Sequence, residues 1–195
     1  LEEIAEINLK KSKSSKREID ICWIRGLSPI YQFNYFLKIL RNLAQLTKYQ
    51  LNISIISAYG NTVIPKEIYE YENLKIILLP RLNKDQFLNC LLNSKLVISI
   101  PESDSSPRSV YESIALGCKI FASNISCFDW LPKELRSEFI FSSSRVYQDS
   151  ENLLMAIDHF SEKNFNDLKV SYPDFFNKLD YKNIARSYLE VFTMV

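Results

Sequence analysis

The chain has 195 residues, of which 47% are apolar and 24% are charged, a balance typical of a globular domain. Its net charge of +1 excludes a strong overall field that would favour nucleic acid or an anionic membrane surface. No apolar run approaches the roughly 20 residues that cross a bilayer.

The predicted elements begin after a charged segment. Residues 1–17 contain a Lys/Ser run with nothing to bury, so we expect a linker or leader there and no signal peptide. From Glu18 onward, short apolar runs alternate with amphipathic stretches. The predicted strands are Ile19–Ile24, Leu51–Ser57, Leu74–Leu79, Leu96–Ile100 and Lys119–Ala122, with Phe139–Phe141 as a short sixth. The predicted helices are Tyr31–Thr47, Pro65–Tyr71, one capped by Asn83, Pro107–Leu116, Ser150–Phe160, Asn164–Ser171 and Asp180–Phe192.

This alternation predicts an α/β fold, namely a doubly wound (Rossmann-like) parallel sheet of about six strands with helices on both faces. Ligands of such sheets bind beyond the carboxyl ends of the strands, where the strand order reverses. For the order 3-2-1-4-5-6, that point lies between the loop Arg25–Ile30 and the loop Pro101–Ser106.

Histidine and cysteine usage narrows the chemistry. His159 is the only histidine, which excludes a His-based catalytic triad or a multi-histidine metal site within this chain. The four cysteines lack the spacing of a metal-binding pair. We expect buried, reduced thiols, as in a cytoplasmic protein. They are Cys22, Cys90, Cys118 and Cys127.

The loop after the fourth strand leads directly into a helix. We expect Ser106 to cap that helix, Pro107 to be its first residue and Gly117 to follow its end. Free backbone N–H groups of residues 106–109 would then face the crevice, and the helix dipole would add partial positive charge. Such a helix N-terminus can bind phosphate.

Two carboxylates accompany this predicted phosphate site. Asp104 lies in the loop, and Glu112 lies about one and a half turns into the helix. Carboxylates accept hydrogen bonds well from the paired hydroxyls of sugars, so the arrangement suits a nucleotide sugar. Alternatively, Glu112 forms a solvated i, i+4 pair with Arg108, and Asp104 makes a local turn.

The segment resembles the donor-site motif of family 4 (group 1) retaining glycosyltransferases, which have the GT-B fold. As in that motif, seven residues separate Asp104 from Glu112, and Ala115 and Gly117 follow in step. The resemblance implies that Asp104 is catalytic and touches the transferred sugar, and that Glu112 holds the ribose hydroxyls. It also implies diphosphate and sugar contacts from the backbone of Ser106, Pro107, Arg108 and Ser109.

The weaker part of the resemblance runs from Glu18 to the end of the chain. It implies that residues 18–195 are a GT-B C-terminal nucleotide-sugar-binding domain, with the N-terminal acceptor domain absent from this chain. Arg81 and Leu82 stand where the family contacts the base, and Asp180–Phe192 resembles its terminal helix.

The loop after the first strand departs from the family pattern. The family places an Arg and a Lys there for the diphosphate, whereas this chain has Gly26 and Tyr31 at those positions. Arg25 is shifted by one residue, which turns it to the other face of an extended segment unless the loop bends. Fewer cations should weaken the diphosphate site, because charge-assisted hydrogen bonds are the strong ones.

The resemblance implies hexosyl transfer, with retention, from a nucleoside-diphosphate sugar to a glycan or lipid-linked acceptor. It implies no metal or other cofactor, no nucleic-acid partner, and a cytoplasmic enzyme of polysaccharide biosynthesis. The full-length protein would sit at the inner face of the membrane through peripheral contact, and the isolated chain would be inactive. The alternative is a non-catalytic GT-B-like binding or interaction module with a degraded diphosphate site.

Two other functions fit the same fold class less well. A nucleotide-sugar epimerase would need acid/base groups, and the His-poor sequence argues against it. A flavodoxin-like regulatory domain predicts clustered Asp residues at the ends of the first and third strands. The segments Trp23–Arg25 and Leu79–Arg81 do not supply them.

Overall fold

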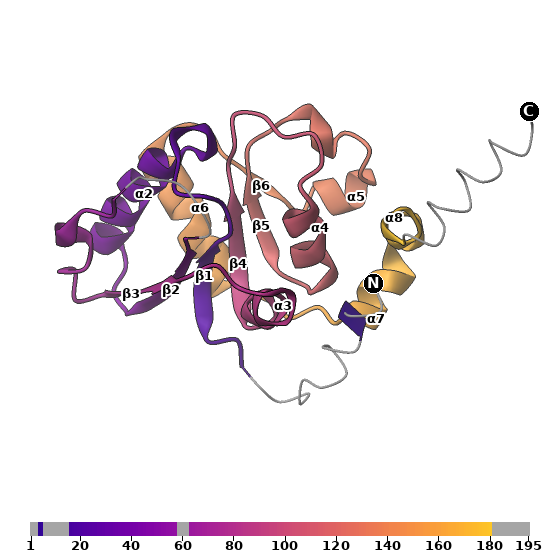
Figure 1. Ribbon diagram of the computed structural model, residues 1–195, viewed down its shortest axis with the longest axis horizontal. Coiled ribbons are helices and arrows are strands. Elements are labelled where there is room, and N and C mark those ends of the chain that lie inside the picture. Colours follow the sequence, from indigo (N-terminus) through magenta and orange to yellow (C-terminus); the bar gives the residue numbers. More distant parts are fainter. Residues whose placement is uncertain (1–3, 6–15, 58–62, 181–195) are drawn as a thin grey trace, which may run out of the picture.

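The computed structural model describes residues 4–5, 16–57 and 63–180. They contain a six-stranded, all-parallel sheet in the order β3-β2-β1-β4-β5-β6, with helices on both faces (Figure 1). The predicted fold class and strand order are therefore confirmed. The strands are β1 (Ile19–Trp23), β2 (Leu51–Ile56), β3 (Leu74–Leu79), β4 (Ser94–Ser99), β5 (Lys119–Ala122) and β6 (Ile140–Phe141).

The helices divide between the two faces of the sheet. One face carries α2 (Phe33–Leu46) and α6 (Val146–Asp158), and the other carries α3 (Lys84–Leu92), α4 (Arg108–Ala115), α5 (Lys133–Arg136) and α7 (Phe165–Ser171). A further helix, α8 (Pro173–Leu179), follows α7. Short 3₁₀ turns are η1 (Pro29–Tyr31), η2 (Lys66–Ile68) and η3 (Ser126–Phe128).

Three predicted helices differ clearly from the structure or fall outside it. The short helix predicted at Pro65–Tyr71 is only the 3₁₀ turn η2. The helix expected from Ser150 begins four residues earlier, at Val146. Its first turn is held by buried Asp149, whose carboxylate accepts hydrogen bonds from the backbone N–H and hydroxyl of Ser143. The helix predicted at Asp180–Phe192 lies outside the described residues from 181 onward. None of the helices that the structure describes is long and apolar enough to cross a bilayer.

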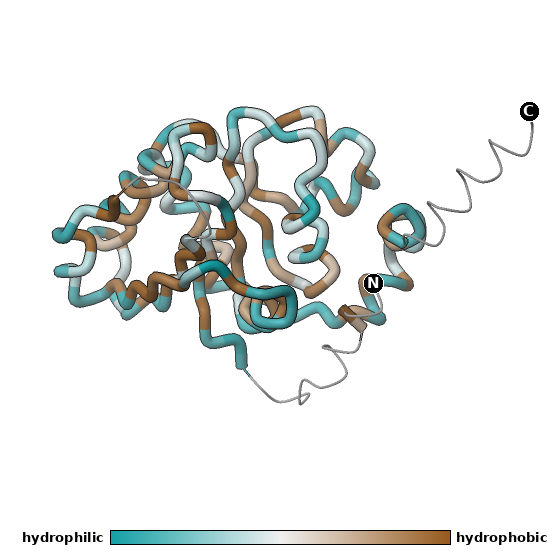
Figure 2. Tube along the Cα trace, viewed as in Figure 1, coloured by the Kyte–Doolittle hydropathy of each residue, from teal (hydrophilic) through white to brown (hydrophobic). Residues whose placement is uncertain are grey.

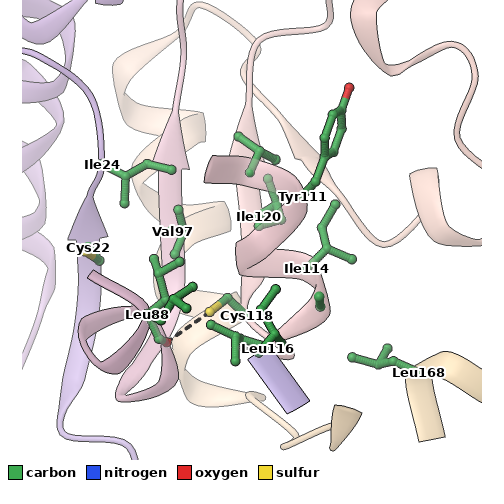
Figure 3. Close-up of a cluster of buried hydrophobic side chains, with 14 of the residues drawn as sticks. Cys22, Ile24, Leu88, Val97, Tyr111, Ile114, Leu116, Cys118, Ile120 and Leu168 are labelled. Carbon is green, nitrogen blue, oxygen red and sulfur yellow. Dashed lines mark hydrogen bonds between the residues drawn. The ribbon is translucent and has the colours of Figure 1, made fainter. Parts of the chain in front are cut away.

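The inner strands β1, β2, β4 and β5 are buried on both faces, which explains their near-continuous apolar sequences (Figure 2), whereas Ile77 and Leu78 of the edge strand β3 are exposed. On the α2 side, the rings of Trp23 and Phe36 stack with centroids 4.7 Å apart. On the other side, Cys22 and Ile120 pack beneath α3 and α4 (Figure 3). All four cysteines are free thiols, as expected, and three are buried, whereas Cys127 is half-buried.

The amino edge of the sheet is anchored by Arg17, which sequence analysis assigned to the linker. Its guanidinium is almost fully buried and donates hydrogen bonds to the carbonyls of Ser94 (2.7 Å) and Leu116 (2.6 Å). Its Nε also pairs with Glu162 at 3.4 Å. Arg17 thus joins the start of β4, the end of α4 and the segment after α6. The structural domain therefore includes at least this residue of the predicted linker.

Gly117 ends α4 at the same edge, as predicted. Its φ of +76° lies in the left-handed region, and a Cβ there would stand 2.2 Å from the Lys163 carbonyl oxygen. Only glycine satisfies both conditions.

Candidate functional site

The candidate site lies at the carboxyl edge of the sheet, where β1 and β4 are neighbours and the chain leaves them for opposite faces. This is the predicted switch point. A backbone hydrogen bond of 3.0 Å from Glu102 N–H to the Ile30 carbonyl joins the two loops. The loops after β1 and β4 therefore form one continuous wall.

Arg25 reaches this crevice despite its shift by one residue. Its Nη2 lies 2.8 Å from Asp104 Oδ2, and its Nε donates to Ser99 Oγ at 2.7 Å. The indole N–H of Trp23 donates to the Arg25 carbonyl at 2.6 Å, which holds the chain in the required bend. The Arg25 and Asp104 side chains are only 11% and 17% exposed. The expectation that Arg25 faces away holds only for an extended segment, and this loop is not extended.

Glu112 is buried on α4 between two cations from different elements. Its Oε1 accepts hydrogen bonds from Arg108 Nε at 3.0 Å and from Lys84 Nζ. Lys84 is the first residue of α3, and a capping box formed by Asn83 and Gln86 fixes that helix start. The i, i+4 pair considered from the sequence is present, but Glu112 is mostly buried rather than solvated.

The start of α4 differs from the predicted phosphate cradle. Pro107, not Ser106, occupies the N-cap position, and Arg108 is the first helical residue. Asp104 Oδ1 accepts from the Ser106 N–H at 3.1 Å, and the Arg108 N–H bonds to the Ser106 carbonyl at 2.8 Å. Proline has no N–H. Of residues 106–109, only Ser109 keeps a backbone N–H without a hydrogen bond within the described part of the chain.

The remaining predicted contacts lie at the end of β3. Arg81 is exposed, and Leu82 is half-buried against the core beneath α3 and α4. Among the described contacts, neither touches Asp104 or Glu112. The structure therefore pairs Arg25 with Asp104 and Arg108 with Glu112, as two ion-pair groups, and it adds to the second group Lys84, which sequence analysis missed.

The site combines three cations with two carboxylates, so its local charge favours an anionic ligand. Burial and then the nearby Asp104 carboxylate raise the pKa of the Cys127 thiol to about 11, so this thiol is neutral near pH 7. Within the described residues, no three His, Cys, Asp or Glu side chains are grouped so that they could hold a metal ion.

No protein-family model and no curated protein sequence matches the chain. Solved structures do. TarM aligns with a TM-score of 0.68 and 14% identity, over 93% of this chain and 36% of TarM. The pneumococcal O-GlcNAc transferase GtfA, solved with UDP and GlcNAc, aligns with a TM-score of 0.66 and 13% identity, over 94% of this chain and 37% of GtfA. A UDP-forming α,α-trehalose-phosphate synthase from Burkholderia xenovorans aligns with a TM-score of 0.61 and 10% identity, over 96% of this chain and 48% of the synthase.

What the chain shares with these proteins is a fold. At identities of 10–14%, the likeness establishes a domain architecture that occurs in GT-B glycosyltransferases. The chain spans between 36% and 48% of the length of these three structures.

Proposed function

We propose that this chain is the donor-binding half of a retaining glycosyltransferase. It would move a hexose from a nucleoside-diphosphate sugar to a glycan or lipid-linked acceptor. The observation that carries the proposal is a set of two ion-pair groups on the loop and helix that follow β4: Arg25 with Asp104, at the point where the strand order reverses, and Glu112 with Arg108 and Lys84. A carboxylate pair for sugar hydroxyls and cations for a diphosphate match the two chemical halves of such a donor.

In this proposal, Glu112 takes the ribose hydroxyls and Asp104 touches the transferred hexose. Transfer breaks the bond between the anomeric carbon and the diphosphate oxygen. The acceptor oxygen forms the new bond on the same face, and its proton leaves with the diphosphate. Arg25, Arg108 and the Ser109 N–H would stabilise the charge on the departing diphosphate, without a metal ion. A second domain would supply the acceptor site.

Lys84 supplies a cation that the loop after β1 lacks. Its ammonium already lies on Glu112, beside the position proposed for the ribose. When ribose hydroxyls donate to Glu112, Lys84 would be released toward the nearest phosphate. We therefore assign to Lys84 part of the role that the family gives to the missing Lys.

The cellular context is proposed on the same basis. A chain with these substrates would serve polysaccharide biosynthesis in the cytoplasm, and the full-length protein would contact the inner face of the membrane peripherally.

A non-catalytic binding module is the second candidate. The start of α4 favours it, because Asp104 and the Ser106 carbonyl already occupy two of the N–H groups expected to hold diphosphate. Activity of the full-length protein on a labelled nucleotide sugar would separate the two candidates.

Calorimetric titration of this chain with UDP, GDP and ADP tests donor binding. We expect one of them to bind at about 1 mM or below, since half a site lacks the contacts of the closed enzyme. Glu112→Ala should weaken that binding about 10–100-fold through loss of charge-assisted hydrogen bonds. Glu70→Ala, at an exposed glutamate before β3, is the matched control and should change nothing. No binding by any of the three, or equal affinity for Glu112→Ala, would refute the proposal.

A further inference from the structure

A cavity lies beside the loop that precedes α4. It has a volume of about 300 Å³ and lies between the start of α4, the segment after β5 and the end of α8. This volume is at the lower end of the range for small-molecule sites, which suits one sugar ring better than a dinucleotide. Its lining includes Ser105, Ser106, Arg108, Tyr111, Trp130 and Lys178.

The aromatic wall of this cavity is fixed in place. The Trp130 indole N–H donates to the Tyr111 hydroxyl at 3.0 Å, and that hydroxyl donates to the Cys127 carbonyl at 3.1 Å. The Trp130 ring also stacks on Phe175 with centroids 5.9 Å apart. Figure 3 shows the Tyr111 hydroxyl pointing away from the buried cluster beneath α4. A half-buried indole held this way loses little freedom when a ligand packs against it.

The charge on the lining is of one sign. Arg108 extends from the first turn of α4 with its side chain 62% exposed, and the Lys178 ammonium lies 5.3 Å from the centroid of the Trp130 ring. Among the described residues that line the cavity, none is acidic. The Glu112 carboxylate that pairs with Arg108 lies outside this lining. An anion entering the cavity therefore meets two cations at its rim.

The hydroxyls of Ser105 and Ser106 complete the set of contacts. Both residues are exposed on the loop that holds Asp104, and each hydroxyl can donate or accept. A sugar ring offers a C–H face for the indole, hydroxyls for the serines and, where charged, an anion for Arg108 and Lys178. We infer that this cavity is a binding site for an anionic sugar, a hexose that carries a phosphate or a carboxylate.

This cavity shares Arg108 and the loop before α4 with the proposed nucleotide site, but Trp130 and Lys178 line the cavity and have no role in that site. Asp104 and Arg25 are not among the residues that line the cavity, whereas Trp130 and Lys178 are. Loss of Lys178 should therefore leave nucleotide affinity unchanged. Because Trp130 and Lys178 belong to this cavity alone, variants of these two residues allow each proposal to fail without the other.

Tryptophan fluorescence offers a direct test, because the chain has two tryptophans and Trp23 is fully buried in the other core. Glucose 6-phosphate and glucuronate, titrated at constant ionic strength, should change the Trp130 emission in a saturable way. Glucose and inorganic phosphate should bind at least about tenfold more weakly, since each lacks half of the contacts. Trp130→Phe keeps a ring against Phe175 and should abolish the signal.

Two lysine variants complete the test. Lys178→Met should weaken glucose 6-phosphate binding about tenfold, whereas Lys169→Met, at an exposed lysine on α7, should have no effect. Circular dichroism would confirm that each variant is folded, and calorimetry with the bound nucleoside diphosphate would confirm that Lys178→Met keeps its affinity. The inference is overturned by an absent signal, by equal binding of inorganic phosphate and glucose 6-phosphate, or by unchanged affinity in Lys178→Met.

Discussion

Two arginines flank β1, and the sheet uses them in opposite ways. Arg17 precedes the strand and donates to the backbone carbonyls of Ser94 and Leu116, which cannot move away without unfolding the elements that carry them. Arg25 follows the strand, donates a hydrogen bond to the Ser99 hydroxyl and forms an ion pair with Asp104, and both of these side chains can exchange partners by rotation. The contacts of Arg17 at the amino edge are therefore fixed by the backbone. The contacts of Arg25 at the carboxyl edge can change with side-chain rotation, as the proposed ligand binding would require.

The largest expected effect is at the amino edge, for Arg17→Met. The substitution leaves two buried carbonyls without donors, at about 1–3 kcal/mol each, so we expect a loss of about 3–5 kcal/mol in the free energy of unfolding. Urea denaturation followed by circular dichroism measures it. A loss below about 1 kcal/mol would show that the buried guanidinium is not the anchor of this edge.

Gly117→Ala should have the next largest effect. The left-handed φ and the contact with the Lys163 carbonyl both oppose a Cβ, so we expect a loss of about 2–4 kcal/mol. Thermal unfolding would report it, and Ala115→Gly in the same helix provides a comparison that adds no atom. If Gly117→Ala proves as stable as the parent, the segment around Lys163 yields more easily than its geometry indicates.

At the carboxyl edge, Arg25→Met combined with Asp104→Leu should change stability by no more than about 1 kcal/mol, because two partly buried charges are removed together. Either single substitution should lower the free energy of unfolding by more, since it leaves the partner's charge partly buried without a counter-charge. Nucleotide binding should be lost in all three variants. Denaturation and calorimetry on the same samples test this, and a double variant less stable than both singles would contradict the comparison.

The smallest expected effect concerns Glu138, at the amino end of β6. Burial tends to raise its pKa, but hydrogen bonds from Lys163 and Tyr172 outweigh burial and hold the pKa below its usual value. Its contribution is complete above the unfolded pKa of about 4.3 and is lost as the pH falls through the folded pKa. The Lys163 and Glu138 side chains are 38% and 27% exposed, so solvent screens the pair and only a few tenths of a kcal/mol are expected.

A pH series of unfolding measurements checks this prediction. Glu138→Gln should flatten the decline in stability below about pH 4.3 relative to the parent chain. The same substitution at the exposed residue Glu70 should leave the decline as it is. A steeper decline for Glu138→Gln would contradict the lowered pKa of Glu138.

The sequence predicted the sheet well because buried parallel strands leave a local signal of short apolar runs between helical patterns. The switch point followed from topology rules, and the pairing of Asp104 with Arg25 is consistent with it. Lys84 could not be predicted, since it reaches Glu112 only through the crossing of α3 beside α4. The structural role of Arg17 could not be predicted either, because Arg17 ends a Lys/Ser run that has the composition of a linker.

The helix start shows a different limit of sequence reasoning. Ser106 followed by Pro107 has the composition of a cap and a first helical residue, but the Asp104 carboxylate takes the Ser106 N–H instead. Capping by Ser106 and a turn made by Asp104 are both possible for this sequence, and the structure has the turn. Asp104 therefore makes the local turn considered as an alternative, and this turn is compatible with its proposed role at the site.

The position of Arg17 has a practical consequence for protein engineering. Fusing this domain to another domain requires a junction, and sequence composition alone would place that junction at Glu18. A chimera cut there would lose the guanidinium that ties β4 to the end of α4. Such a chimera would be unstable because it lacks Arg17, and the instability could be mistaken for incompatibility between the two domains. Any modular exchange of this domain should therefore carry the fold from Arg17 onward.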